Sequence, residues 1–136
     1  MDKPCAFAMM TTPRAIRVLV ADHSDAAIES LSSHLANDPR LEIVGSARNG
    51  FALIRAAQNT QPDLVIANIH LPSGEAEEIV STLRLLVPEA RIIVFTVYDL
   101  LMTRIVFLEA GANAVVRGSQ IFDRISNEIR RLFPPE

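Results

Sequence analysis

The sequence Ile16-Arg17-Val18-Leu19-Val20-Ala21-Asp22 contains a short, mainly apolar run at residues 16–21, which an acidic residue follows. Its centre is apolar without alternation, which is typical of a strand covered by helices on both faces of a sheet. Similar runs follow at residues 41–47, 64–68, 91–96 and 114–117. Short strands alternating with longer stretches predict repeated βα units and a parallel sheet.

The longer stretches have helical periodicity. We expect helices near residues 25–37, 51–59, 75–87, 100–110 and 120–133. Apolar residues at three- or four-residue spacing form their predicted inward faces; these are Ile28, Leu31 and Leu35, then Ile79, Leu83 and Leu86, then Ile121, Ile125 and Ile129. Ser24 is placed to cap the first helix, whereas Asn49-Gly50 and Gly111 are typical of turns.

These patterns predict a single-domain, flavodoxin-like (βα)5 fold, a three-layer α/β sandwich with a parallel sheet of strand order 2-1-3-4-5. A length of 136 residues with 49% apolar residues suffices for one domain with its own core. We expect a flexible tail over residues 1–15, the folded domain over 16–133, a short end at 134–136 and no output domain.

Charge and hydropathy narrow the classes of function. The net charge is -3, which argues against direct nucleic-acid binding because such proteins usually carry an excess of Lys and Arg. The apolar run at residues 5–10 is too short for a signal peptide or a membrane span. A lone cysteine, Cys5, supports no disulfide framework. We therefore predict a cytoplasmic protein without membrane contact.

Polar residues follow four of the predicted strands, in the order Asp22-His23, Asn68, Thr96 and Arg117. Together with the segments at residues 16–22 and 41–47 and the element Glu109-Ala110-Gly111-Ala112, this order resembles a response-regulator receiver domain. The likeness extends from about residue 16 to residue 132 and is greatest to the NarL/FixJ branch. It implies a role in two-component phosphorelay signalling.

The resemblance also implies a phosphorylation pocket, and this sequence departs from it. In the family, the strand ends carry two acids, a phosphorylated aspartate, a Thr or Ser, and a lysine. The residues at these positions are Asp22, His23, Asn68, Thr96 and Arg117. An amide does not replace a carboxylate nucleophile, and Mg²⁺ prefers anionic oxygen ligands. The family's aromatic switch position is Ala114. We expect a degenerate pocket with no catalytic residue, metal or cofactor.

Several interpretations of the pocket residues remain open. Arg117 is expected to pair with Asp22, which would fill the space that a metal and a phosphate use. Thr96 suits a strand end by packing alone, because it is β-branched. His23 and His70 together with Asp22 also offer the ligand types of a Zn²⁺ site, whereas a simpler interpretation makes both imidazoles solvated polar groups.

The predicted fourth helix is more apolar than one buried face requires. With Leu101, Ile105 and Leu108 against the sheet, Met102 and Val106 would lie on the outer side near Tyr98. The family resemblance implies that this region is a partner or homodimer surface. Alternatively, these are single exposed apolar residues of the kind that most proteins carry.

Three functional hypotheses follow. The first is a stand-alone receiver-like signalling protein that acts by protein–protein contact or dimerisation, without aspartyl phosphorylation. The second is a small-ligand or transition-metal sensor that uses the pocket at the strand ends. The third, an enzyme, is not predicted, because the loops assemble no Ser–His–Asp or Cys–His arrangement.

Overall fold

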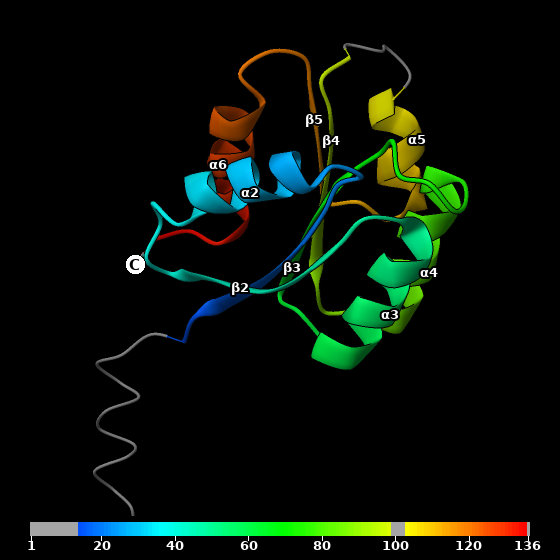
Figure 1. Ribbon diagram of the computed structural model, residues 1–136, viewed down its shortest axis with the longest axis horizontal. Helices are drawn as coiled ribbons and strands as arrows, with labels where there is room; N and C mark the ends of the chain where they lie inside the picture. Colours follow the sequence, from blue (N-terminus) through cyan, green and yellow to red (C-terminus); the bar gives the residue numbers. More distant parts are fainter. Residues whose placement is uncertain (1–13, 99–102, 136) are drawn as a thin grey trace, which may run out of the picture.

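The computed structural model describes residues 14–98 and 103–135. Five parallel strands form a sheet of order β2-β1-β3-β4-β5, as predicted (Figure 1). The strands are β1 (Ile16–Ala21), β2 (Leu41–Ala47), β3 (Leu64–Asn68), β4 (Arg91–Thr96) and β5 (Ala114–Arg117). The helices are α2 (Asp25–Leu35), α3 (Gly50–Thr60), α4 (Ala76–Leu86), α5 (Thr103–Ala110) and α6 (Ile121–Leu132). All five strands have the predicted bounds.

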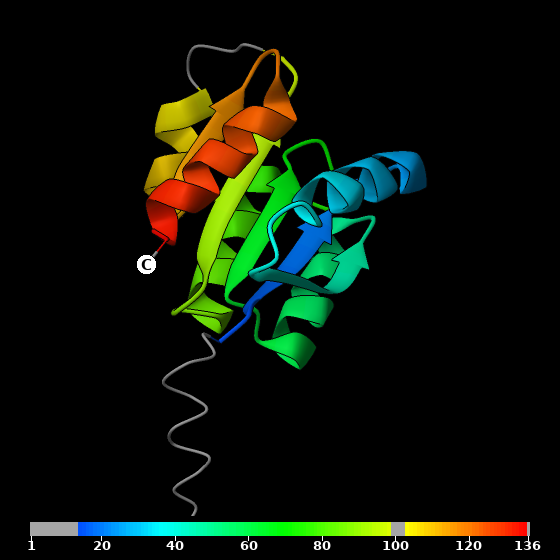
Figure 2. The ribbon, with the colours of Figure 1, turned by 90° about the vertical axis from the view of Figure 1, so that its left-hand side faces the viewer.

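The helices cover both faces of the sheet, which gives the predicted three layers. Figures 1 and 2 show α2 and α6 on one face and α3, α4 and α5 on the other. Strand β1 contributes to both cores because successive side chains alternate. Leu19 packs with residues of α3 and α4, whereas Val18 and Val20 pack with residues of α2 and α6. This two-sided burial explains why the strand sequences lack polar alternation.

The helix starts follow local side-chain chemistry. Ser24 caps α2, its Oγ accepting a hydrogen bond from the Ala27 amide at 3.2 Å. Asn49 caps α3 in the same way and is not part of a simple turn, because its Oδ1 accepts from the Ala52 amide at 2.8 Å. Gly50 then begins α3 where a Cβ would lie 2.5 Å from the Ser73 carbonyl oxygen. The close approach of two backbones therefore requires glycine there.

The predicted orientation of the fourth helix, which is α5 in the structure, is wrong. In α5 the inward positions belong to Thr103 and Phe107, which are 7% and 6% exposed. Ile105 and Leu108, expected against the sheet, are 53% and 36% exposed. The Phe107 ring packs in the same core cluster as strand β4, and its size determines which face of the helix turns inward.

The outer side predicted for this helix changes accordingly. Val106, expected to be exposed, is half-buried. Tyr98, which precedes the helix, is 59% exposed as that interpretation requires. Leu101 and Met102 lie outside the described residues. The apolar side chains that α5 exposes are Ile105 and Leu108, so they replace Val106 in any surface built on this helix.

One arginine joins the loops that precede β4 and β5 through hydrogen bonds. Arg84 of α4 donates hydrogen bonds to the Ala90 carbonyl at 2.7 Å, the Gly111 carbonyl at 2.9 Å and Asn113 Oδ1 at 2.7 Å. Burial lowers the pKa of Arg84, with a smaller contribution from Arg91, but a guanidinium remains charged in proteins. Carbonyl oxygens therefore solvate this cation and fix where β5 begins.

The first described residue is also bound to the domain. Arg14, placed in the predicted tail, pairs with Asp63 at 3.1 Å. Residues 1–13 of that tail lie outside the described residues.

Among the described residues, none of the helices has the length and apolarity that a membrane span needs.

The loop between α2 and β2 gives a testable pH dependence. Asp38 accepts hydrogen bonds from the Arg40 amide at 3.0 Å and its Nε at 3.2 Å, while Arg40 also donates to the Phe133 carbonyl at 2.7 Å. The Arg40 side chain lowers the pKa of Asp38. A lowered folded-state pKa stabilises the fold above the unfolded pKa of about 4, and this stability is lost as the pH falls through the folded value.

We predict that Asp38→Asn lowers the free energy of unfolding by about 1 kcal/mol at pH 7 and by less at pH 3. Urea unfolding at both pH values measures this difference. Glu42→Gln, at an exposed position of β2, is the control and should change stability at neither pH. An equal loss for Asp38→Asn at both pH values would contradict the assignment.

Candidate functional site

Polar side chains lie at the ends of four strands, along the carboxyl-terminal edge of the sheet. Asp22 directly follows β1, Asn68 ends β3, Thr96 ends β4 and Arg117 ends β5. The strand register places these ends side by side: Ala21 pairs with Ala67, Asn68 with Phe95, and Thr96 with Arg117. The parallel topology therefore brings together residues that lie up to 95 positions apart in the sequence, from 22 to 117. This is the edge at which ligands bind in sheets of this kind.

Asp22 is the buried acid of the edge, with only 4% of its surface exposed. Its Oδ2 accepts a hydrogen bond from Asn68 Nδ2 at 3.0 Å, and its Oδ1 accepts from the Ser24 amide at 3.2 Å. His23 Nδ1 lies 3.3 Å from the same Oδ1. A buried carboxylate is costly unless hydrogen bonds compensate it, and these groups supply that compensation.

The amide of Asn68 has a defined orientation. Its Nδ2 donates to Asp22, and its Oδ1 accepts from the His70 amide at 2.8 Å. The two neighbours determine this orientation, because a carboxylate accepts and a backbone N–H donates. The amide oxygen therefore points toward the following loop, and the amide N–H points toward the carboxylate.

A second pair of hydrogen bonds joins the loops after β3 and β4. His70 Nε2 lies 3.0 Å from Thr96 Oγ1, which also accepts from the Tyr98 amide at 3.2 Å. The His70 and Tyr98 rings meet edge to face at 5.4 Å. Thr96 is fully buried, so its hydroxyl depends on these partners. Packing alone therefore does not account for Thr96. Sequence reasoning missed its contact with His70, because nothing in the spacing indicates it.

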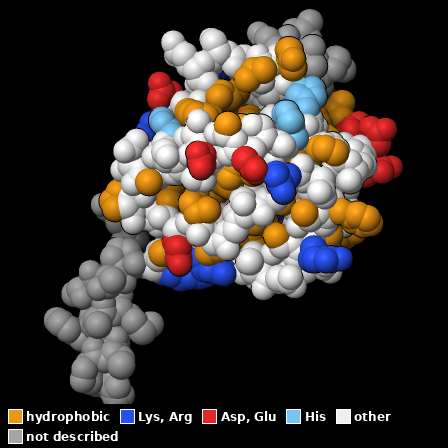
Figure 3. Space-filling model, viewed as in Figure 1, with side chains coloured by type: hydrophobic (Ala, Val, Ile, Leu, Met, Phe, Trp, Pro, Cys, Tyr) orange, Lys and Arg blue, Asp and Glu red, His pale blue; other side chains and the backbone are white. Residues whose placement is uncertain are grey.

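The histidines do not form the metal site considered above. Figure 3 shows histidine side chains at the surface of this end of the molecule. His23 lies beside Asp22, whereas the Nε2 of His70 lies against Thr96. Within residues 14–98 and 103–135, no group of three or more His, Cys, Asp or Glu side chains is arranged to hold a metal ion. The transition-metal interpretation gains no support from this geometry.

The remaining predicted residues lie on β5. Arg117 is half-buried beside Thr96, and its carbonyl accepts a hydrogen bond from Arg124 at 2.8 Å. Its pairing with Asp22 remains a prediction. Ala114 is 5% exposed and packs with residues of α2 and α6, so a methyl group occupies the position that the resemblance assigns to an aromatic switch.

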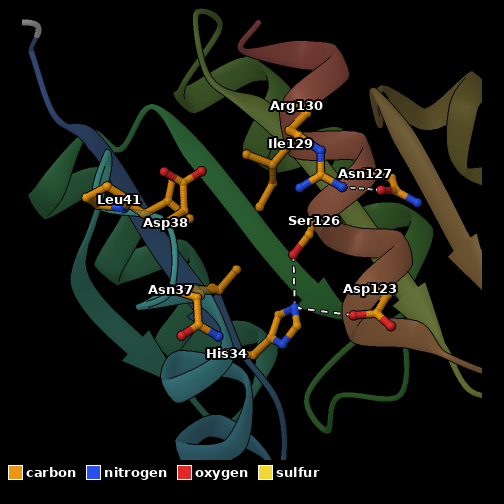
Figure 4. Close-up of a pocket in the computed structure, with 11 residues that line it drawn as sticks. His34, Asn37, Asp38, Leu41, Asp123, Ser126, Asn127, Ile129 and Arg130 are labelled. Carbon is orange, nitrogen blue, oxygen red and sulfur yellow. Dashed lines mark hydrogen bonds and ion pairs between the residues drawn. The ribbon is translucent and has the colours of Figure 1, made fainter. Parts of the chain in front are cut away.

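A groove between α2 and α6 was not predicted. It has a volume of about 500 Å³ and is shown in Figure 4. His34 points from α2 toward α6, with its Nε2 2.9 Å from Ser126 Oγ and 4.0 Å from Asp123 Oδ1. Asp38 and Asp123 bring negative charge to the lining, and Arg130 brings positive charge. Because charges of both signs line the groove, they select no single class of ligand.

Comparison with known families identifies the class of protein. Residues 18–130 match the sequence profile of the response regulator receiver domain, which is more than half of the chain. The chain therefore belongs to the response regulator receiver domain family, and it has the receiver fold of two-component signalling proteins.

Relatives and solved structures agree with this assignment. The chain is 32% identical over 121 residues to the protein-glutamate methylesterase/protein-glutamine glutaminase 4 of Myxococcus xanthus, covering 85% of this chain and 34% of that protein. It is 28% identical over 99 residues to the uncharacterized transcriptional regulatory protein YhcZ of Bacillus subtilis, covering 73% of this chain and 46% of that protein. The chain thus spans between a third and a half of the length of these two relatives.

The fold is similar to two solved receivers. The CheX–CheY–BeF3–Mg complex of Borrelia burgdorferi gives a TM-score of 0.82 at 17% identity, covering 93% of this chain and 95% of that one. The signal receiver domain of NarL from Mycobacterium tuberculosis gives 0.80 at 18% identity, covering 88% and 97%. These likenesses establish the fold, and the NarL/FixJ branch remains a prediction.

The Asp22–Asn68 hydrogen bond predicts a pH-dependent effect of mutation. Asn68→Asp replaces the donor with a second carboxylate near a buried one, so we expect a loss of about 2 kcal/mol in unfolding free energy at pH 7. The repulsion requires both groups to be ionised, so the loss should diminish between pH 7 and pH 3 as the pair takes up a proton. Thermal and urea unfolding across this pH range measure it.

Asn68→Ala is the matched control. It removes the donor without adding charge, so its loss of stability should vary less with pH than that of Asn68→Asp. Equal pH dependence in the two variants would contradict the hydrogen-bond assignment.

Proposed function

We propose that this chain is a receiver-type signalling protein that acts through protein–protein contact without aspartyl phosphorylation. One observation carries the proposal: the strand end where receivers present a nucleophilic carboxylate holds Asn68, whose amide N–H is hydrogen-bonded to Asp22 at 3.0 Å. An amide nitrogen that donates to a carboxylate does not attack phosphorus. Its oxygen is likewise occupied by the His70 amide at 2.8 Å.

The same residues fit Mg²⁺ poorly. The hard cation prefers several oxygen ligands, and carboxylates contribute most of the charge. Here Asp22 already accepts hydrogen bonds through both oxygens, and His23 places an imidazole nitrogen 3.3 Å from one of them. Asn68 turns its N–H group toward Asp22. The edge is therefore stabilised by hydrogen bonds within the protein, and no step of the proposed function involves a metal.

The contact between His70 and Thr96 supports a constant conformation. Receivers share a Thr or Ser hydroxyl at this strand end. Here the Thr96 hydroxyl contacts His70 and accepts a hydrogen bond from the Tyr98 amide. Thr96 thus has partners within the chain that need no phosphoryl group. In the proposed function the chain maintains one receiver conformation and presents one surface to its partner.

The small-ligand sensor is the weaker candidate. It requires polar groups at the strand ends that are available to a ligand. Asp22, Asn68, His70 and Thr96 instead hydrogen-bond one another. No observation favours this sensor over an interaction protein.

The partner surface predicted near the helix after β4 is revised by the structure. Tyr98 remains a candidate at 59% exposure, and Ile105 and Leu108 join it because α5 presents them outward. Met102 lies outside the described residues, and Val106 is half-buried. A partner protein or a second copy of the chain is the proposed occupant of this region.

A phosphodonor assay tests the proposed function. Incubation with acetyl phosphate and Mg²⁺, followed by intact mass measurement, should leave the wild-type mass unchanged. The double variant His23→Asp with Asn68→Asp restores two carboxylates beside Asp22, so it should gain the mass of one phosphoryl group. A stable phosphoryl adduct on the wild type would refute the proposal.

A matched variant controls for added charge. His34→Asp with Asn37→Asp makes the same chemical changes on α2 and in the loop after it, away from the strand ends. It should gain no phosphoryl group. Phosphorylation of this control would show that the assay does not report on the pocket.

A further inference from the structure

Two exposed hydrophobic side chains lie on neighbouring helices. Phe51 of α3 is 80% exposed and Leu85 of α4 is 81% exposed, which makes them the most exposed large hydrophobic residues that the structure describes. Helices α3 and α4 pack side by side on one face of the sheet (Figures 1 and 2). Single exposed apolar residues are common in proteins, whereas neighbouring ones indicate a contact surface.

The position of Phe51 in its helix keeps it on the outer side. Gly50, Leu53 and Ala57 form the buried side of α3, so Phe51 points away from the sheet. Arg55 follows four residues later and is exposed on the same outer side. Both residues line a groove of about 450 Å³ along this helix. The outer side of α3 therefore carries an aromatic ring beside a positive charge.

Helix α4 has an outer side of opposite charge. Glu78 and Leu85 are both exposed and lie seven residues apart, a spacing that returns to the same side of a helix. Glu77 is a second exposed carboxylate beside Glu78. The basic residue of the last turn, Arg84, is directed to backbone carbonyls. The outer side of α4 is therefore acidic near its start and apolar near its end.

The starts of the two helices lie level with each other. Both helices follow strands of a parallel sheet, so they run in the same direction. Gly50, the first residue of α3, lies against the side chain of Ile79 in the first turn of α4. Four side chains thus mark the corners of one surface, the α3–α4 face: Phe51 and Leu85 at the ends of one diagonal, and Arg55 and Glu78 at the ends of the other.

This arrangement is complementary to itself. A two-fold axis along the apolar diagonal sets Phe51 and Leu85 near their counterparts in a second copy and exchanges the two charged corners. Arg55 of each copy then faces Glu78 of the other, so opposite charges meet twice. We infer that the α3–α4 face joins two copies of this chain in a homodimer.

The size of the face predicts a weak and reversible dimer. Each helix has 11 residues, so the face is about 16 Å long and about 20 Å wide. This is smaller than a standard interface of about 800 Å² per partner, so we expect a dissociation constant in the micromolar range. The inference goes beyond the proposed function, because it uses helices other than α5, where the partner surface is proposed.

Sedimentation velocity over a series of micromolar concentrations of the full chain tests the inference. We expect a monomer–dimer equilibrium. Phe51→Ser should raise the dissociation constant about tenfold, because it removes an apolar anchor. Arg55→Glu and Glu78→Arg should each raise it about tenfold, because each sets like charges against one another. All three side chains are exposed, and circular dichroism checks that the variants are folded.

A mixture of two single variants tests the two-fold arrangement itself. In a heterodimer of Arg55→Glu with Glu78→Arg, the introduced carboxylate of one copy faces the introduced guanidinium of the other, and the unchanged Arg55 faces the unchanged Glu78. The mixture should therefore dimerise as tightly as the wild type, although neither variant does so alone. A fluorescent label on Cys5, the single cysteine of the sequence, allows the heterodimer to be followed.

Glu29→Arg is the matched control. Glu29 is also an exposed glutamate on a helix, but it lies on α2, which covers the opposite face of the sheet (Figure 2). The substitution makes the same change of charge as Glu78→Arg and should leave the dissociation constant unchanged.

Several outcomes would overturn the inference: a wild type that stays monomeric, a dimer that Phe51→Ser leaves intact, or a mixture that dimerises no better than its two variants. A dimer that Ile105→Asp dissociates and Phe51→Ser does not would assign self-association to α5 instead. None of these results bears on phosphorylation. A phosphoryl adduct on the wild type would refute the proposed function and leave the dimer data unaffected.

Discussion

The buried carboxylate of Asp22 is the constraint on which the strand-end site depends. At 4% exposure, it needs compensation from its surroundings. In this chain an amide of Asn68 and the backbone amide of Ser24 supply hydrogen bonds to its two oxygens. The Oγ of Ser24 also caps α2, so the residue whose amide solvates the acid also sets the start of that helix. The loop after β1 and the end of β3 are thereby held together.

The hydrogen bonds continue from this acid across the sheet edge. Asn68 accepts from the His70 amide, and the ring of His70 contacts Thr96, which accepts from the Tyr98 amide. Asp22 and Thr96 are the buried members, so removal of the Asn68 or His70 side chain would leave one of them without a partner. In the proposed function, these hydrogen bonds hold the edge in one conformation. The proposed function differs in this respect from that of a receiver that changes state when it is phosphorylated.

The fold could be predicted from the sequence because its central strands are continuous apolar runs. The runs around Val18-Leu19-Val20 and in residues 64–67 are buried on both faces, so apolar continuity alone locates them. The orientation of α5 could not be predicted, because Leu101, Ile105, Phe107 and Leu108 offer competing faces and the fit of Phe107 against β4 decides among them. The site was predictable as a set of strand ends. The direction of the Asn68 amide and the His70–Thr96 contact depend on loop conformations. The spacing of residues in the sequence does not indicate these conformations.

The hydrogen bonds at the strand ends reach the edge strand β5. Thr96 pairs with Arg117 in the β4–β5 ladder, and Arg117 ends β5. Arg124 of α6 donates to the Arg117 carbonyl at 2.8 Å, so the last helix is joined to the same strand end. In the proposed function, a strand-end site that keeps one conformation would therefore keep β5 and α6 in one arrangement as well. A surface that is already ordered loses less conformational entropy when a partner binds, which favours binding without a phosphorylation signal.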